Sequence, residues 1–268
     1  MSPELTFALS LALRMAVSAA FVVAGSIITE RSGAAIGALV STLPVSAGPA
    51  YIFLAFDHDA AFIAQSALAS LPMNAATVLM ILVIVVLAQR FGMLVSLGAG
   101  LAVWLLFALT VRLFDWTLAA GIALNVVSFA IALPLVQRFR VAKMPLITRR
   151  WYDIPLRAAL VASVVATVVT LSNILGARVS GAIALFPVVT TNLVLILMPR
   201  IGGPPTAALL ANSQWGLIGF ALAIVVIHLA TQPFGRAAAL SLALATSLIW
   251  NFGLWFYERR RMRLVSSA

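Results

Sequence analysis

The sequence predicts an all-α integral membrane protein of about nine transmembrane helices. Composition is the first reason, because 63% of the 268 residues are hydrophobic and only 9% are charged. The mean hydropathy of +1.14 is far above what a water-facing globular surface allows. The second reason is the length of the apolar runs, which can cross a hydrocarbon core of about 30 Å.

The apolar runs are continuous and are separated by charges or by Gly and Pro residues. Backbone groups in lipid must be satisfied within the chain, and short alternating segments are missing, so we expect helices rather than barrel strands. The predicted helices cover residues 10–29, 35–56, 62–88, 93–113, 117–137, 155–176, 179–199, 205–231 and 236–257.

Charge predicts the orientation of the chain. The net charge is +10, but the basic residues lie at the ends of apolar runs, which argues against a nucleic-acid partner. Lys and Arg in short loops are retained on the cytoplasmic side. We therefore expect a multi-pass protein of the plasma (inner) membrane, with the N-terminus outside and the C-terminus cytoplasmic, although Arg14 favours the opposite side for the N-terminus. The basic segments contain Arg138, Arg140, Lys143, Arg149 and Arg150, and Arg259, Arg260, Arg261 and Arg263.

Motifs of enzyme chemistry are missing from the sequence. The chain has no Cys, which excludes disulfides, thiolate metal sites and cysteine nucleophiles. We find no nucleophile with a nearby base, no intramembrane carboxylate pair, no HExxH pattern and no glycine-rich phosphate loop. We expect no enzymatic activity, no cofactor and no metal site, and interpret Asp57-His58-Asp59 as a solvated cap outside the membrane.

An internal repeat divides the chain. Three sets of residues recur at one offset of 143 positions, as between Arg14 and Arg157. We infer two four-helix units, residues 1–113 and 155–268, joined by a linking helix and a basic loop in residues 114–154. Five helices separate equivalent points, so the second unit enters the membrane from the opposite face, as in inverted-repeat transporters. A duplicated structural protein stays open as the alternative. The matches are Leu13-Arg14 with Leu156-Arg157, Pro44-Val45 with Pro187-Val188, and Gln89, Phe91 and Gly92 with Gln232, Phe234 and Gly235.

Equivalent prolines mark the candidate substrate site. Pro44 and Pro187 lie near the middle of the second and seventh predicted helices, where each removes a backbone hydrogen bond and breaks or kinks the helix. Freed backbone groups and half-helix ends can bind a substrate at the midplane. Proline kinks are also common in membrane helices, and hydroxyls often bond back to the preceding turn. The polar residues around the two breaks are Ser41, Thr42 and Ser46, and Thr190, Thr191 and Asn192.

Amides on the third and eighth predicted helices extend this polar set. Because amides are costly in lipid, we expect Gln65, Asn74, Asn212 and Gln214 to face the bundle interior, either lining a polar path or bonding helices together. His228 lies inside the eighth predicted helix, where an interior hydrogen bond is favoured over a proton relay.

The acidic residues favour a neutral or anionic substrate. All seven lie at or beyond the ends of the apolar runs, whereas proton pumps and cation exchangers rely on buried carboxylates. The sequence therefore predicts a secondary transporter or permease for a small neutral or anionic solute, with membrane lipids as partners. A non-transport membrane accessory or assembly protein and a lipid-linked substrate flippase stay open, as does a homo-oligomer.

Residues 180–187, Ser-Gly-Ala-Ile-Ala-Leu-Phe-Pro, are followed by a Thr-bearing apolar run. This stretch resembles the signature region of the GlpM-like small inner-membrane proteins, which are single four-helix units. The first unit has Thr42-Leu43-Pro44 there, which keeps the Pro and loses the Phe. The resemblance implies a fusion of two such units in opposite orientation and brings no settled activity.

Overall fold

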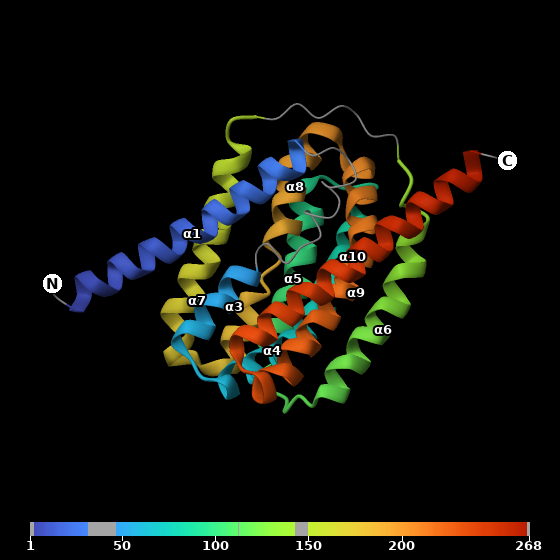
Figure 1. The fold of residues 1–268 in the computed structure, drawn as a ribbon. Coiled ribbons are helices and arrows are strands. Elements are labelled where there is room, and N and C mark those ends of the chain that lie inside the picture. The colour runs from blue at the N-terminus through green and yellow to red at the C-terminus, as the bar shows by residue number, and fades with distance from the viewer. Residues whose placement is uncertain (1–2, 32–46, 112, 143–149, 267–268) are drawn as a thin grey trace.

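The computed structural model describes residues 3–31, 47–111, 113–142 and 150–266, and all regular structure within these ranges is helical. The predicted all-helical class is confirmed. Figure 1 shows the helices packed as one bundle, with the N-terminus of α1 and the C-terminus of α10 extending beyond it on opposite sides. The helices are α1 (Pro3–Arg31), α3 (Ala47–Asp57), α4 (Ala60–Leu87), α5 (Met93–Val111), α6 (Leu118–Gln137), α7 (Asp153–Ala184), α8 (Val188–Ile201), α9 (Gly203–Phe234) and α10 (Arg236–Ser266).

Seven segments of the described chain are long and apolar enough to cross a membrane, which indicates a multi-pass membrane protein. Two predicted helices are not among them. The first corresponds to α1, whose apolar part Leu9–Phe21 is shorter, and the second falls partly on residues 32–46, outside the described ranges. The number nine therefore stays a prediction. The seven segments are Ala60–Leu87, Met93–Val111, Leu118–Gln137, Asp153–Ser172, Gly176–Ile201, Gly203–Phe234 and Arg236–Tyr257.

Helix α4 forms the centre of the bundle. Its sequence is apolar around its whole circumference, as expected of a helix that is covered on every side. Helices α5, α6, α7 and α9 all pack against it, and most of its residues are buried, including Pro72. The Asp59 side chain caps its N-terminus by accepting a hydrogen bond of 2.8 Å from the backbone N–H of Phe62.

Helices α4 and α9 pack antiparallel. Residues successively closer to the C-terminus of α4 contact residues successively closer to the N-terminus of α9. Asn74 and Leu217, which meet in the middle, are separated by the repeat offset of 143. In order along α4, the contacts are Ala64 O with His228 Nδ1 at 2.8 Å, Asn74 Nδ2 with Leu217 O at 3.4 Å, Val78 O with Gln214 Nε2 at 3.2 Å, and Ala88 O beside the Cα of Gly203.

Two pairs of helices in the predicted units begin at corresponding positions. Helix α4 begins at Ala60 and α9 at Gly203, and α5 begins at Met93 and α10 at Arg236. Both differences equal the sequence offset (203 − 60 and 236 − 93). The packing corresponds as well, because α5 packs on α4 as α10 packs on α9, and α5 contacts α8 as α10 contacts α3.

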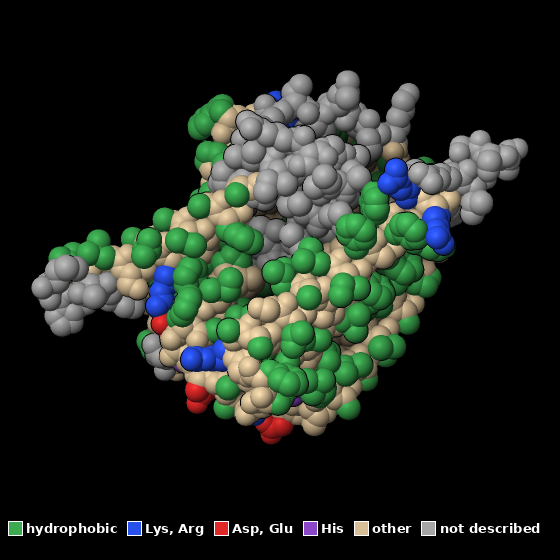
Figure 2. Space-filling view, in the orientation of Figure 1, with side chains coloured by type: hydrophobic (Ala, Val, Ile, Leu, Met, Phe, Trp, Pro, Cys, Tyr) green, Lys and Arg blue, Asp and Glu red, His purple; other side chains and the backbone are tan. Residues whose placement is uncertain are grey.

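Charged side chains differ between the two ends of the bundle. The α3–α4 end, which holds the turn at residues 58–59, carries Asp57, Asp59 and Asp115 near three arginines, and acidic side chains are visible at the lower edge of Figure 2. The α8–α9 end, which holds the turn at Gly202, carries Asp153 and many arginines. Those arginines are Arg90, Arg138, Arg140, Arg150, Arg157, Arg200, Arg259 and Arg260.

Two ion pairs share one repeat position, at which the charge is reversed. At the α3–α4 end, Arg14 of α1 forms a bidentate pair with Asp57, its Nη2 lying 2.7 Å from Oδ1. At the α8–α9 end, Asp153 of α7 pairs with Arg200, whose Nη1 lies 2.9 Å from Oδ2. Asp57 and Arg200 are separated by the repeat offset. At this one repeat position, an aspartate in the first unit and an arginine in the second each form an ion pair.

Close packing of α7 on α4 depends on Gly181. A Cβ at this position would lie 2.1 Å from the backbone O of Ser66, which cannot move without shifting α4. We predict that Gly181→Ala lowers the free energy of unfolding by about 1–3 kcal/mol. The matched variant Gly98→Ala, with no atom within 4 Å of the new Cβ, should gain about 0.5–1 kcal/mol. Thermal unfolding in detergent measures both, and equal melting temperatures would contradict the close approach.

Candidate functional site

The membrane-crossing segment Gly176–Ile201 is interrupted at Pro187. Helix α7 ends at Ala184, Leu185 leaves helical geometry, and Pro187 serves as the N-cap of α8. Proline has no N–H, and its ring would clash with the carbonyl of Ile183 in a continuous helix. The last turn tightens instead, with Phe186 N donating to Ile183 O at 2.9 Å. The predicted break at Pro187 is confirmed.

A second irregularity lies at Gly176, whose φ of 72° and ψ of 178° interrupt α7. This left-handed backbone conformation favours glycine because no Cβ is present to clash. Gly176 lies at the boundary between two predicted helices, 155–176 and 179–199. The chain turns here between two helical segments of α7, and Ser180 Oγ donates to the Gly176 carbonyl at 2.9 Å.

The N-terminus of α8 begins inside the protein without a side-chain cap. Pro187 and Val188 are buried, and Val188 N donates back to Phe186 O at 2.7 Å. The first-turn N–H groups of a helix have no intrahelical acceptor, and the helix dipole makes this end positive. Such an end favours an anion or the oxygen of a neutral polar molecule.

Unpartnered polar atoms surround this helix end. Thr191 and Asn192, on the first two turns of α8, are only 5% and 4% exposed. Trp104 of α5 is 3% exposed, and its ring meets Phe186 edge-on with centroids 5.4 Å apart. Within the described residues, Thr191 Oγ1, Asn192 Oδ1 and Trp104 Nε1 have no hydrogen-bond partner. We call Trp104, Phe186, Pro187, Thr191 and Asn192 the break site.

Trp104 was not among the predicted site residues. Tryptophan in membrane helices is enriched at the two interfaces, and Trp104 lies in the middle of an apolar run, which is a signal that could have identified it. Its repeat equivalent is Ser247 of α10, which is also buried with an unpartnered Oγ among the described residues. Trp104 and Ser247 are therefore buried polar side chains at the same repeat position, each with a polar atom that has no partner among the described residues.

The predicted site residues of the first unit cannot be placed. Ser41, Thr42, Pro44 and Ser46 lie outside the described residues. The second unit provides the predicted Pro187, Thr190, Thr191 and Asn192, all of them buried. The structure brings them together at the start of α8.

Three amides form a separate buried cluster between α4, α6 and α9. Asn74 Nδ2 donates to Asn125 Oδ1 at 2.8 Å, and Asn125 Nδ2 donates to Leu71 O at 2.8 Å. Gln214 is fully buried and donates to Val78 O. Asn74 Oδ1 and Gln214 Oε1 have no partner within the described residues. Asn74 and Gln214 thus face the interior as predicted, where their donor groups hold helices together.

Two other amides do not face the interior, and that prediction is wrong for them. Gln65 is exposed on α4, because Ser66 on the neighbouring face makes the close contact with α7, donating to Ala177 O at 3.0 Å. Asn212 is also exposed. It accepts from Arg140 Nε at 2.7 Å and donates to Arg140 O at 3.0 Å, so it fastens the segment after α6 to α9.

Hydroxyl and imidazole groups elsewhere in the core have partners. Ser70 donates to Gly181 O at 2.8 Å, so the Tyr51 hydroxyl, 2.6 Å away, donates to Ser70. His228 Nδ1 lies 2.8 Å from Ala64 O. A carbonyl oxygen only accepts, so Nδ1 carries the proton. His228 thus makes the interior hydrogen bond that the sequence favours.

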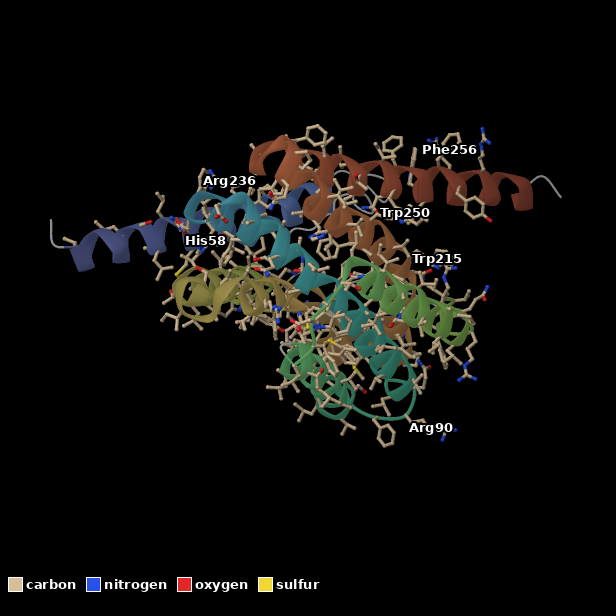
Figure 3. All side chains as sticks on the ribbon, turned by 90° about the horizontal axis from the view of Figure 1, so that it is seen from below. His58, Arg90, Trp215, Arg236, Trp250 and Phe256 are labelled. Atoms are coloured by element: carbon tan, nitrogen blue, oxygen red, sulfur yellow. The ribbon has the colours of Figure 1, made fainter. Side chains whose placement is uncertain are left out.

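His58, in the turn outside the helices, marks the α3–α4 end. Its Nε2 lies 2.9 Å from Ser172 Oγ, and its carbonyl accepts from Arg236, which lies beside it in Figure 3. Burial lowers the pKa of His58, and the nearby carboxylates of Asp57 and Asp59 oppose this shift. In the part of the chain that the structure describes, no three His, Cys, Asp or Glu residues come close enough to hold a metal ion.

The break site and the amide cluster should respond differently to loss of a polar group. Asn74→Leu removes donors to Asn125 and Leu217 and should cost about 0.6–2 kcal/mol of stability. Asn192→Leu replaces a buried oxygen that has no partner in the described part of the chain, and it should leave stability unchanged or raise it by up to about 1–3 kcal/mol. Thermal unfolding of the two variants in detergent checks this. An equal loss for Asn192→Leu would make Asn192 a structural residue.

Comparison of the chain with known proteins finds no relative. No protein-family model, no curated protein and no solved structure matches the chain. The functional argument therefore depends on the break site and on the arrangement of the helices around it.

Proposed function

We propose that the protein is a secondary membrane transporter or permease for a small neutral or anionic solute. The observation that carries this proposal is the break site, where α8 begins inside the protein without a side-chain cap. Polar atoms of Thr191, Asn192 and Trp104 beside it have no partner among the described residues. Buried polar groups without partners cost stability. A bound solute that supplies the missing hydrogen bonds explains why these polar groups are buried.

An inverted repeat completes the proposal, because two opposed units can rock about a central site and open it to either face. If a two-fold axis relates the units, a helix that contacts its equivalent does so at equivalent residues. If that axis lies in the membrane plane, the two helices run antiparallel. The antiparallel pair α4 and α9, in contact at Asn74 and Leu217, supports this geometry. The matched starts of α4 with α9 and of α5 with α10 support it further.

Charge reversal in the ion pairs supports opposite orientation of the units. Asp57 and Arg200 are equivalent, each directly following the second predicted helix of its unit, yet one is acidic and the other basic. The positive-inside rule favours the arginine at the cytoplasmic end if the two ends face opposite sides of the membrane. The arginine-rich α8–α9 end is then cytoplasmic. The resemblance to GlpM-like proteins implies the same fusion of two opposed units.

The chemistry of the break site favours a neutral or anionic solute. The positive end of α8 and the Trp104 N–H attract an oxygen acceptor, and the Asn192 carbonyl and Thr191 hydroxyl accept from a hydroxyl or amine. The four described aspartates lie at helix ends, away from this site. A cation would lack a carboxylate partner there.

Access of water to the break site tests transport without knowledge of the solute. We predict that Thr191→Cys reacts with a small water-soluble thiol reagent added to either face of membrane vesicles, because alternating access wets the site from both sides in turn. The chain has no other Cys. Labelling of right-side-out and inside-out vesicles measures this.

Ala67→Cys is the matched control, because Ala67 is fully buried in the apolar core on α4 and should stay unlabelled. If Thr191→Cys is as unreactive as this control from both faces, the break site is dry. That result would exclude the transport proposal and favour a non-transport accessory or assembly protein.

A further inference from the structure

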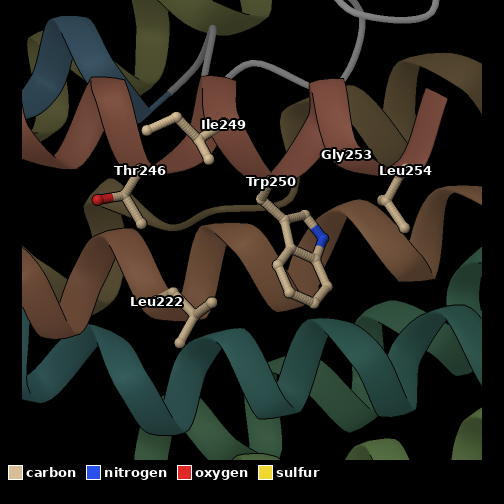
Figure 4. Close-up of a pocket in the computed structure, with 6 residues that line it drawn as sticks. All are labelled: Leu222, Thr246, Ile249, Trp250, Gly253 and Leu254. Carbon is tan, nitrogen blue, oxygen red and sulfur yellow. The ribbon is translucent and has the colours of Figure 1, made fainter. Parts of the chain in front are cut away.

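An apolar groove of about 430 Å³ lies between α9 and α10 and is open on one side (Figure 4). The polar groups that line the groove already make hydrogen bonds within the protein. Thr246 Oγ1 donates to Leu242 O on its own helix at 2.8 Å, and Trp250 Nε1 donates to Trp215 O at 2.9 Å. The groove therefore suits an apolar occupant. It is lined by Leu222, Thr246, Ile249, Trp250, Gly253 and Leu254.

Glycines shape the groove. The indole of Trp250 packs against Gly219 of α9, where an added Cβ would lie 2.4 Å from the indole Cδ1. Trp250 is thus fixed by packing and by its hydrogen bond. At Gly253, an added Cβ would meet no atom within 4 Å. The rim is apolar and accessible, with Ile249 73% and Leu222 42% exposed.

Arginines lie on α10 just beyond the groove. Arg259 is five residues past Leu254, about 7.5 Å along the helix. Arg260 follows Gly253 by seven residues and so lies on the same helix face. Both arginines are exposed, and their guanidinium carbons lie 5.1 Å and 4.4 Å from the ring centroids of Trp255 and Phe256. Aromatic and basic side chains together are typical of the membrane interface.

A second cationic contact lies at the same end of the bundle. Arg140 lies over the ring of Trp215, 5.8 Å from its centroid, and Trp215 accepts the hydrogen bond from Trp250. Figure 3 shows Trp215 and Trp250 close together, with Phe256 further along α10. An apolar groove that leads toward cationic side chains matches a molecule with an acyl chain and an anionic head.

We propose that this groove binds one acyl chain of an anionic phospholipid whose phosphate is held by Arg259 and Arg260. The groove supplies apolar contact for the chain, and the arginines supply charge-assisted hydrogen bonds to the phosphate. A basic residue near the membrane surface favours an anionic over a zwitterionic lipid by about fivefold. This site is independent of the proposed transport activity, since none of its lining residues belongs to the break site.

Quenching of Trp250 fluorescence by brominated lipid tests the site. The full chain is reconstituted in phosphatidylcholine vesicles that contain a few per cent of brominated phosphatidylglycerol or, separately, brominated phosphatidylcholine. The Trp250→Phe variant supplies the signal of the other tryptophans for subtraction. We expect the anionic lipid to quench Trp250 with at least a fivefold higher apparent affinity.

Two variants separate the head and chain contacts. Arg260→Gln should reduce the preference for the anionic lipid about fivefold, whereas Arg90→Gln, an arginine remote from Trp250 in Figure 3, should not. Gly253→Phe fills the groove and should reduce quenching by both lipids, and Gly98→Phe on α5 serves as its control. Equal quenching by the two lipids in the unchanged protein would overturn the proposal. If instead Gly253→Cys forms an oxidative cross-link between two copies of the chain and neither lipid quenches Trp250, a second copy occupies the groove and the proposal is overturned.

Discussion

Within a bilayer, helix association depends on close packing and interhelical hydrogen bonds, because lipid tails are as apolar as the side chains they would cover. The antiparallel contact of α4 and α9 meets this requirement along the full length of both helices. The helices approach tightly at Gly203, where an added Cβ would lie 1.9 Å from Ala88 O. The amides of Asn74 and Gln214 bond across its middle. Helices α5, α6 and α7 pack on α4, and α10 packs on α9, so this pair positions every other spanning segment.

The break site differs from this arrangement, because buried polar groups there lack hydrogen-bond partners among the described residues. Backbone that is not helical is tolerated at membrane depth where it is enclosed by protein or lines a cavity. The interruption at Pro187 is enclosed, yet Thr191, Asn192 and Trp104 offer polar atoms without partners in the described chain. Unsatisfied groups of this kind collect at functional sites, where a ligand completes them. The buried amides of Asn74, Asn125 and Gln214, near the α4–α9 contact, instead use most of their hydrogen bonds to hold helices together.

Sequence reasoning predicted those features that follow from local chemistry. Apolar runs predicted the helices, Pro187 predicted the break, and the repeat offset matches the starts of α4 and α9. Features that depend on helix rotation and packing could not be predicted. Gln65 and Ser66 are adjacent in sequence, and only packing against Gly181 decides that the serine faces inward. The partner of Asn212 is likewise set by where the chain runs after α6.

The most direct test of the inverted repeat is to determine which side of the membrane each of two equivalent positions faces. Ala61 and Pro204 are equivalent by the offset of 143, are exposed and lie beside the turns at the two ends of the bundle. Single cysteines at these positions can be labelled in intact cells with a membrane-impermeant thiol reagent. The account predicts labelling of Ala61→Cys and none of Pro204→Cys unless the cells are opened. Labelling of both or of neither in intact cells would place the two units in the same orientation and contradict it.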